Sequence, residues 1–288
     1  MSKLSIGIIG GGVLGRAIFR GFVEHADCRV YDTKPERSTV YHLADAATAD
    51  IVFIALPTPA LPDGRCDTLY IDDFLRTAFS EEWWKPGSCY CVRSTVNIGY
   101  TQSKAGEYLY SRPLFHSPEF LTARCANTDF QVPARNIIGS PSHPISGHWA
   151  SAHERLCGLY AARFPGVPCL TMHSNASELV KLACNSFFAA KVTLFNLFSE
   201  IAQAAGVDWE QVRAGIMSDG RVAHAHTMVP GPDSRGGYGG QCLNKDSADL
   251  YRCAEAMGVD AGILREVIER NERTRGDDPG LTRVNLRD

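Results

Sequence analysis

No stretch of the 288 residues holds the roughly 20 consecutive apolar residues that a helix needs to cross a bilayer. The opening residues, MSKLSIGIIGGG, place no cationic region before a long apolar segment, so we do not interpret them as a signal peptide. Neither sign of charge dominates, since 29 Lys and Arg stand against 32 Asp and Glu. Because a long apolar run is missing, we expect no membrane partner. Because the charge is balanced, we also expect no nucleic acid, since phosphate binding needs a concentrated basic surface.

The ten cysteines include no C-x-x-C pair, which argues against a structural zinc site. Their density is below that of disulfide-stapled proteins, and we expect mostly buried free thiols in a reducing cytoplasm. The histidines form no convincing ligand set, and we expect surface or capping positions for His143, His148, His153, His224 and His226. We predict no metal site.

A hydrophobic share of 44% and a charged share of 21% are typical of a globular protein, and the length suits about two domains. In the first half, short apolar runs alternate with helical segments. These runs lie at 4–9, 28–31, 51–56, 88–93, 113–116 and 135–139. Apolar strands separated by helices predict a Rossmann-like, doubly wound parallel sheet of the α/β class.

After about residue 172 the pattern becomes helical. Residues 175–205 keep helical spacing of apolar side chains and predict one long helix, with Asn175 and Glu178 as a capping arrangement and Gly206 as its end. Shorter helices are expected at about 208–217, 244–257 and 259–274. The predicted organisation is a sheet domain at 1–172, an all-helical domain at 173–275 and a loose polar tail at 276–288.

A glycine motif follows the first expected strand and opens a helix. Gly10 permits a tight turn, Gly12 lets the backbone approach a pyrophosphate, and Gly15 allows close helix–strand packing. The first helical residues, Val13 and Leu14, would present their amides to the phosphates. The motif therefore predicts a dinucleotide site, with a glycine-rich turn that binds nothing as the alternative.

Asp32 ends the second expected strand, 17 residues after Gly15. A carboxylate there can accept hydrogen bonds from ribose hydroxyls and would repel a 2′-phosphate. We therefore predict NAD as the cofactor, although Lys34 weakens the preference over NADP slightly.

Polar or turn-forming residues follow three further strands. They are Pro57 and Thr58, Ser94 and Thr95, and Glu119 with Phe120 and Leu121. Because the carboxyl ends of the strands form the ligand crevice of such a sheet, Thr95 and Glu119 are candidates to face a substrate beside the nicotinamide. Helix capping accounts for these residues equally well at this point.

Lys181 and Asn185 are four residues apart and share one helix face, although such a pair is usually solvated surface. The segment GGYGGQCLNKD at 236–246 surrounds an aromatic with four glycines, which suggests backbone close to a ligand. A helix N-terminus and Lys245 could stabilise a Cys242 thiolate, which beside a nicotinamide could add to an aldehyde. A flexible loop with an incidental cysteine is the alternative.

Together these motifs resemble the UDP-glucose/GDP-mannose dehydrogenase family, the nucleotide-sugar 6-dehydrogenases. The matching pieces are GGGVLG at 10–15, ADIVFIALPTP at 49–59, STV at 94–96, SPEFL at 117–121, SELVKLACNSFFAAK at 177–191, DGR at 219–221, GGYGGQCLNKD at 236–246 and LREVIERNER at 264–273. They run in family order from residue 5 to about 275, and the GGYGGQC element is highly specific to the family.

The resemblance implies NAD-dependent, four-electron oxidation of a primary alcohol of a nucleotide-linked sugar, such as UDP-glucose, to the carboxylate. It makes Cys242 the nucleophile that forms a thiohemiacetal and then a thioester. Lys181 and Asn185 would stabilise negative charge on oxygen, and Asp246 and Thr95 would position a water molecule.

By the same resemblance, Glu119 is the general base of thioester hydrolysis, and Arg221 reaches the substrate of a neighbouring subunit. Lys245 would lie near the cofactor, as would Pro57, Thr58 and Ser94. Residues expected to contact the substrate are Phe120, Leu121, Lys181, Asn185, Arg221, Tyr238 and Gly239. A homodimer through the 175–205 helix is also implied.

Two departures from the family pattern concern substrate recognition. The resemblance ends near residue 275, so we expect a short form lacking the C-terminal nucleotide-binding domain; another chain could supply that domain, or the substrate could be smaller. The acid usual after the SPEFL motif is replaced by the run 122–124, TAR. Two alternatives stay open: a two-electron β-hydroxyacid-type dehydrogenase that does not use Cys242, and a catalytically silent NAD-binding homologue.

Overall fold

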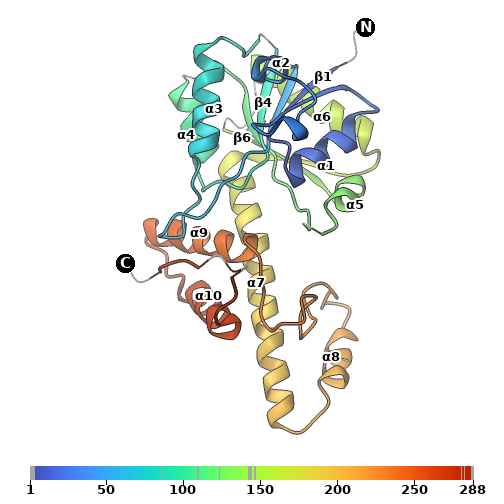
Figure 1. Cartoon of the computed structure of the whole chain (residues 1–288), viewed down its shortest axis with the longest axis vertical. Helices are drawn as coiled ribbons and strands as arrows, with labels where there is room; N and C mark the ends of the chain where they lie inside the picture. The colour runs from blue at the N-terminus through green and yellow to red at the C-terminus, as the bar shows by residue number, and fades with distance from the viewer. Residues whose placement is uncertain are drawn as a thin grey trace. The chain divides into compact units, whose positions relative to one another are not determined.

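The computed structural model describes residues 4–85, 87–108, 110–122, 124–141, 145, 147–279, 281 and 283–286 (Figure 1). The chain divides into two compact units. The sheet unit comprises Met1–Thr58 and Asp67–Lys181, and the helical unit comprises Pro59–Cys66 and Leu182–Asp288.

The sheet unit contains a seven-stranded sheet in the order β2-β1-β3-β4-β5-β6-β7. Its strands are β1 (Ser5–Ile9), β2 (Asp27–Tyr31), β3 (Ile51–Ile54), β4 (Cys89–Val92), β5 (Leu114–His116), β6 (Asn136–Ser140) and β7 (Cys169–His173). Neighbouring strands are parallel except for β5 and β6, which meet antiparallel at one residue pair. The predicted Rossmann-like, doubly wound fold is confirmed, with an additional edge strand, β7.

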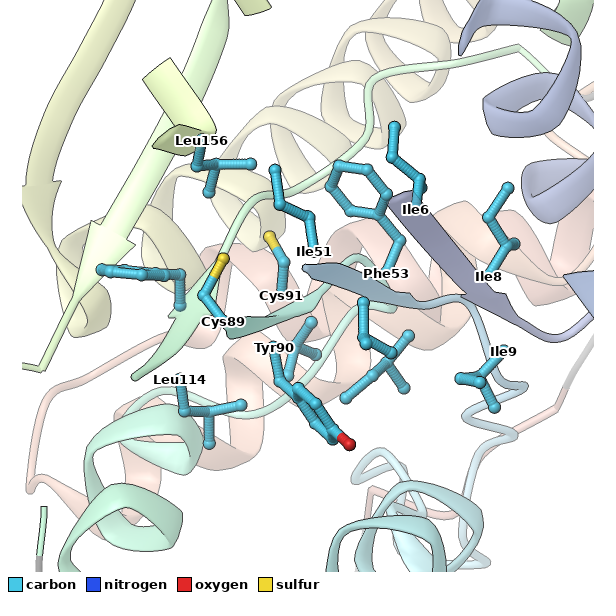
Figure 2. Close-up of a cluster of buried hydrophobic side chains, with 14 of the residues drawn as sticks. Ile6, Ile8, Ile9, Ile51, Phe53, Cys89, Tyr90, Cys91, Leu114 and Leu156 are labelled. Carbon is cyan, nitrogen blue, oxygen red and sulfur yellow. The ribbon is translucent and has the colours of Figure 1, made fainter. Parts of the chain in front are cut away.

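The helices of this unit are α1 (Val13–Phe22), α2 (Leu43–Ala47), α3 (Leu69–Ser80), α4 (Tyr100–Glu107), α5 (Ala126–Gln131) and α6 (His148–Arg163), with a 3-10 turn at Pro35–Arg37. Side chains of the central strands alternate between the faces of the sheet: Cys89 and Cys91 point to one side and Tyr90 to the other (Figure 2). Phe53 and both cysteines are buried, so these cysteines act as the small apolar core residues that the sequence predicted.

Helix α7 (Ser174–Ala204) follows β7 directly and is continuous from the sheet unit into the helical unit (yellow in Figure 1). It ends close to the predicted residue, where Gly206 has a left-handed φ of 69°. The expected capping role of Glu178 within α7 was wrong. Its carboxylate instead accepts hydrogen bonds from the Gly99 and Thr101 amides, 2.6 and 2.8 Å away, and so caps α4.

The other helices of the helical unit are α8 (Trp209–Met217), α9 (Cys242–Ala256) and α10 (Gly262–Arg275). The units differ from the predicted domains 1–172, 173–275 and 276–288 because of long-range contacts. In the expected tail, Leu281, Val284 and Leu286 are buried. The segment Pro59–Cys66 also belongs to this unit, where the Cys66 amide donates to Asp249 at 3.1 Å.

Within the described residues, no helix is both long and apolar enough to span a membrane. Of the ten cysteines only Cys66, Cys89 and Cys91 are buried, five are half-buried, and Cys125 and Cys242 are exposed, so the expectation that most of them are buried was wrong.

His116 provides a test of the packing at the junction of β5 and α7. The ring is fully buried, and its Nδ1 lies 2.7 Å from the Ser177 hydroxyl. Burial, together with the positive charges of Arg93 and Lys181, lowers the pKa of His116 to about 3. An unfolded histidine takes up a proton near pH 6.5, so stability should be lost as the pH falls from about 6.5 towards 3, by up to about 1.4 kcal/mol per pH unit.

We expect His116→Asn to flatten this dependence, measured as the free energy of unfolding by urea titration between pH 7 and pH 4. Burial raises the pKa of Glu178 to about 7, which acts in the opposite direction in both proteins and cancels in their difference. Equal pH slopes for the two proteins would contradict the assignment.

Candidate active site

The glycine loop shows which of its residues the protein itself requires to be glycine. Gly10 has a left-handed φ of 101°, and its amide donates to the Tyr31 carbonyl at 2.8 Å. A Cβ atom on Gly15 would lie 1.8 Å from the Gly10 carbonyl oxygen, so α1 can pack here only with glycine. A Cβ atom on Gly12 would meet nothing within 4 Å. Packing does not explain Gly12, which leaves open space for a ligand directly before Val13 and Leu14 of α1.

Asp32 is held beside this loop at the end of β2. One carboxylate oxygen accepts from the Gly11 amide at 2.7 Å and the other from the Lys34 amide at 2.9 Å. A carboxylate offers about four acceptor positions, so two bonds leave capacity for ribose hydroxyls. Lys34 thus supports Asp32 through its backbone amide, and Lys34 is exposed to solvent.

The residues after β3 and β4 line the same end of the sheet unit. The Ser94 hydroxyl donates to the Leu56 carbonyl at 2.6 Å and so ties the ends of these strands together. Ser94 and Thr58 are buried, Thr95 is half-buried and Pro57 is exposed. The helix-capping alternative for Ser94 therefore does not hold, because its hydroxyl serves a neighbouring strand.

Glu119 and Lys181 form an ion pair in the sheet unit, in which Lys181 is buried and Glu119 half-buried. Lys181 Nζ lies 2.8 Å from Glu119 Oε1, and Glu119 Oε2 accepts from the Leu121 amide at 2.6 Å. Lys181 is only 4% exposed and Asn185 only 8%, so neither is the solvated helix residue of the alternative interpretation. Such pairs need good geometry, because burying an unpaired ammonium is costly.

A pocket with about 350 Å³ of free space lies next to this pair. Its lining includes Glu119, Phe120 and Leu121, the residues that the sequence assigned to catalysis and substrate contact. The Arg135 guanidinium stacks over the Phe120 ring at 4.3 Å, and Lys181 Nζ lies 5.8 Å from the same ring. Both cations thus lie near this ring.

In the helical unit, a chain of polar contacts connects Asn185 to α9. Asn185 Nδ2 donates to Asp246 Oδ2 at 2.5 Å, and Asp246 Oδ1 lies 2.7 Å from Lys245 Nζ. The Lys245 ammonium also lies 3.1 Å from Cys66 Sγ. Burial acts to lower the pKa of Lys245, but its pKa is raised because Asp246 and the Cys66 thiol outweigh that effect.

The contact between Lys245 and Cys66 was not predicted from the sequence. Lys245 was expected beside the cofactor and as support for a Cys242 thiolate; in the structure its ammonium contacts Asp246 and Cys66. Cys66 lies 179 residues earlier in the chain, and no local pattern signals the pairing.

Cys242 is the first residue of α9 and is exposed. The partial positive charge of a helix N-terminus favours the thiolate over the thiol. The structure therefore has Cys242 at the junction between a loop and a helix that the sequence predicted.

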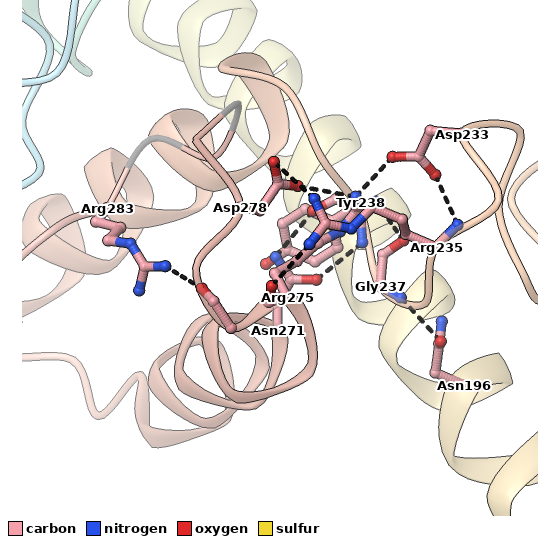
Figure 3. Close-up of polar contacts among 10 residues, drawn as sticks. Asn196, Asp233, Arg235, Gly237, Tyr238, Asn271, Arg275, Asp278 and Arg283 are labelled. Atoms are coloured by element: carbon pink, nitrogen blue, oxygen red, sulfur yellow. Dashed lines mark hydrogen bonds and ion pairs between the residues drawn. The ribbon is translucent and has the colours of Figure 1, made fainter.

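The loop that leads to Cys242 is clamped by three side chains from α7 and α10 (Figure 3). The Gly237 amide donates to Asn196 at 2.8 Å, and its carbonyl accepts from Arg275 at 2.9 Å. The Tyr238 amide donates to Asn271 Oδ1 at 2.8 Å, and its carbonyl accepts from Asn271 Nδ2 at 3.0 Å. All four backbone groups of Gly237 and Tyr238 are thus satisfied by side chains, in place of a regular strand or helix.

The clamp explains why this loop is rich in glycine. A Cβ atom on Gly237 would lie 2.5 Å from Asn271 Oδ1, and one on Gly239 would lie 3.0 Å from the Arg275 guanidinium. Arg275 cannot easily withdraw, because it also pairs with Asp233 at 2.6 Å. The sequence suggested that the glycines allow backbone close to a ligand; for these two, the close neighbours are side chains of the same chain.

Tyr238 and Arg221, which were both predicted to contact the substrate, differ in their exposure to solvent. Tyr238 is 5% exposed and packs with Ala189 and Val267, so its ring belongs to a small core. Arg221 is highly exposed and pairs with Asp219 at 2.6 Å.

No group of three His, Cys, Asp or Glu side chains able to hold a metal occurs in the part of the chain that the structure describes. His226 stacks on Phe188 at 4.4 Å. His143 lies outside the described residues.

We expect Asn271→Ala to loosen the clamp, because it removes both hydrogen bonds to Tyr238 and leaves two buried backbone groups unpaired. Each such group costs about 1–3 kcal/mol. Urea unfolding should show this loss, and alkylation of Cys242 should change in rate. Arg270→Ala, on the same helix but in an exposed ion pair with Glu200, is the matched control. Equal effects of the two substitutions would refute the clamp.

Comparison with known proteins extends over both units. Residues 31–161 match the NAD binding domain, and residues 175–273 the central domain, of the UDP-glucose/GDP-mannose dehydrogenase family. The UDP-glucose 6-dehydrogenase of Pseudomonas aeruginosa is 33% identical over 243 residues, which are 80% of this chain and 50% of that protein. The chain thus spans about half the length of the curated relatives it matches.

Two solved structures illustrate the fold. A UDP-glucose dehydrogenase from the archaeon Pyrobaculum islandicum superposes with a TM-score of 0.79 at 26% identity, covering 94% of this chain and 68% of that one. The 3-hydroxyisobutyrate dehydrogenase of Mycobacterium tuberculosis superposes with a TM-score of 0.74 at 16% identity, covering 97% and 96%, and shares the fold. The NAD binding domain model identifies NAD as the cofactor, and both domain models together show that the chain belongs to the UDP-glucose/GDP-mannose dehydrogenase family.

Proposed function

We propose that this chain oxidises the primary alcohol of a nucleotide-linked sugar, such as UDP-glucose, to the carboxylate in two NAD-dependent steps. The observation that carries the proposal is the exposed Cys242 thiol at the first turn of α9, at the end of a clamped loop. A two-electron dehydrogenase has no use for a positioned nucleophile, whereas a four-electron one needs it to hold the aldehyde. The name of the Pseudomonas aeruginosa relative supports the choice of substrate.

In this proposal, Cys242 binds the substrate covalently between the first oxidation and the release of the product. Its thiolate adds to the aldehyde carbon and forms a thiohemiacetal, which becomes a thioester once a hydride is lost. Water then breaks the carbon–sulfur bond, which releases the carboxylate and restores the thiol. NAD, when bound, accepts the hydride in each of the two oxidations. The Gly10–Gly15 loop and Asp32 would hold its pyrophosphate and ribose.

The remaining roles follow from donors and acceptors. The Lys181 ammonium and the Asn185 amide would stabilise the negative oxygen of the tetrahedral species. Both belong to α7, one turn apart, and therefore lie on one face of that helix. Glu119 would take a proton from the hydrolytic water, and Thr95 and Asp246 would position that water.

The stoichiometry of NADH formation tests this proposal. With excess NAD and limiting UDP-glucose, we expect two NADH per sugar, and free and phosphorylated hexoses serve as comparison substrates. Cys242→Ala should lower acid formation by more than about 1,000-fold, because the covalent path is lost. Cys125→Ala, which removes another exposed thiol, should leave turnover unchanged.

Other outcomes separate the alternatives. One NADH per turnover, independent of Cys242, would replace the proposal with a two-electron β-hydroxyacid-type reaction. NAD binding without NADH from any substrate would indicate a catalytically silent homologue.

We also propose that two copies associate through α7 (Ser174–Ala204), the helix that the sequence predicted at 175–205. This helix exposes Leu179, Phe187, Leu194 and Ile201, whose side chains are 43–64% exposed. Phe187, Leu194 and Ile201 recur every seven residues and form one apolar stripe. The exposed Arg221 would then reach the partner's substrate. A cytoplasmic location belongs to the same proposal, because the density of cysteines is below that of disulfide-stapled proteins and suits a reducing compartment.

Charge placed in the stripe should dissociate this dimer. We expect Phe187→Asp to sediment as a monomer in analytical ultracentrifugation at concentrations where the unaltered chain is a dimer. Ile263→Asp, at an exposed apolar position on α10, is the matched control and should remain dimeric. A dimer that persists in Phe187→Asp would exclude this face.

A further inference from the structure

Two cysteines, a histidine and a threonine meet between α6 and β7, and none of the four belongs to the proposed active site. Cys157 and His153 are one turn apart on α6, with Cys157 Sγ 3.4 Å from His153 Nε2. The same nitrogen lies 2.9 Å from the Thr171 hydroxyl on β7. Cys169, the first residue of β7, lies two residues before Thr171 and therefore on the same face of that strand, where its thiol acts on Cys157.

This environment activates one sulfur and leaves it accessible. The hydrogen bond from Cys169, and then the hydrogen bond and charge of His153, lower the pKa of Cys157 to about 5, while the pKa of Cys169 is raised by Cys157. Cys157 and Cys169 are both half-buried. In contrast, burial raises the pKa of the core thiols Cys89 and Cys91. Reactive thiols are typically the partly exposed ones beside a histidine and a second thiol.

We propose that Cys157 and Cys169 form a redox-active dithiol that hydroperoxides convert into a disulfide. The Cys157 thiolate attacks the nearer peroxide oxygen, and the O–O bond breaks to give a sulfenic acid and hydroxide or alkoxide, which takes up a proton. The Cys169 sulfur then attacks the Cys157 sulfur, the S–S bond forms, the S–O bond breaks and water leaves. The hydroperoxide accepts the two electrons that the two thiols lose.

The position in the fold makes this a crosslink between neighbouring elements. β7 is the edge strand of the sheet and pairs only with β6 in the described strand order, and it runs directly into α7. Oxidation would join β7 covalently to α6 across the short connection at 164–168. The reaction is independent of NAD, of the sugar and of Cys242.

The test uses the reduced full chain with Cys242→Ala as background, so that the proposed catalytic thiol is absent. After treatment with hydrogen peroxide, differential alkylation and peptide mass spectrometry should show that Cys157 and Cys169 lose their label together. The mass should fall by about 2 Da and dithiothreitol should restore it. In Cys169→Ser, dimedone should trap the sulfenic acid at Cys157.

The exposed Cys125 is the matched control thiol. Alkylation of Cys157 should persist at pH 6, where an unperturbed thiol with a pKa near 8.5 reacts roughly 75-fold more slowly than at pH 8. His153→Asn should narrow that difference, because the hydrogen bond and charge of His153 are then lost while Cys169 remains. Loss of label at Cys125 as fast as at Cys157, or oxidation of Cys157 while Cys169 stays fully labelled, would overturn the proposal.

Discussion

The rest of the structure depends on how the first turns of α7 pack against the sheet. Glu178 satisfies two amides at the start of α4, and Ser177 bonds to the buried His116. The approach is so close that a Cβ atom on Gly139 would lie 2.0 Å from the Ser177 hydroxyl. Because these contacts fix the rotation of the helix, they determine that Lys181, one turn later, meets Glu119.

In the helical unit, the glycine-rich loop at 236–240 is likewise held by contacts too close for a Cβ atom at Gly237. Side-chain amides and a guanidinium replace the backbone partners that a strand or helix would supply, and they must come close to do so. Glycine is then required by neighbouring side chains, and the same motif that identifies the family is in part a packing requirement. A motif can thus indicate function correctly while the reason for each of its residues lies elsewhere in the chain.

What the sequence could predict was local. Patterns of a few residues predicted the glycine loop, Asp32 at the end of its strand and the long helix. The structure has all three where they were expected. Strand β7 was not predicted, because none of its five residues is buried and it therefore shows no apolar alternation. The burial of Val284 and the pairing of Lys245 with Cys66 depend on contacts between distant segments, which no window of sequence contains.

The buried charges also set the direction of a hydrogen bond that the proposed chemistry needs. Lys245 pairs with Asp246, and an ionised carboxylate can only accept hydrogen bonds. Asp246 therefore binds the NH₂ group of Asn185, not its carbonyl, which fixes how that amide is turned. One hydrogen of the NH₂ group points at Asp246, and the second stays a donor with a defined direction. A single donor held in this way, one helix turn from the Lys181 ammonium, is what stabilisation of a developing oxyanion requires.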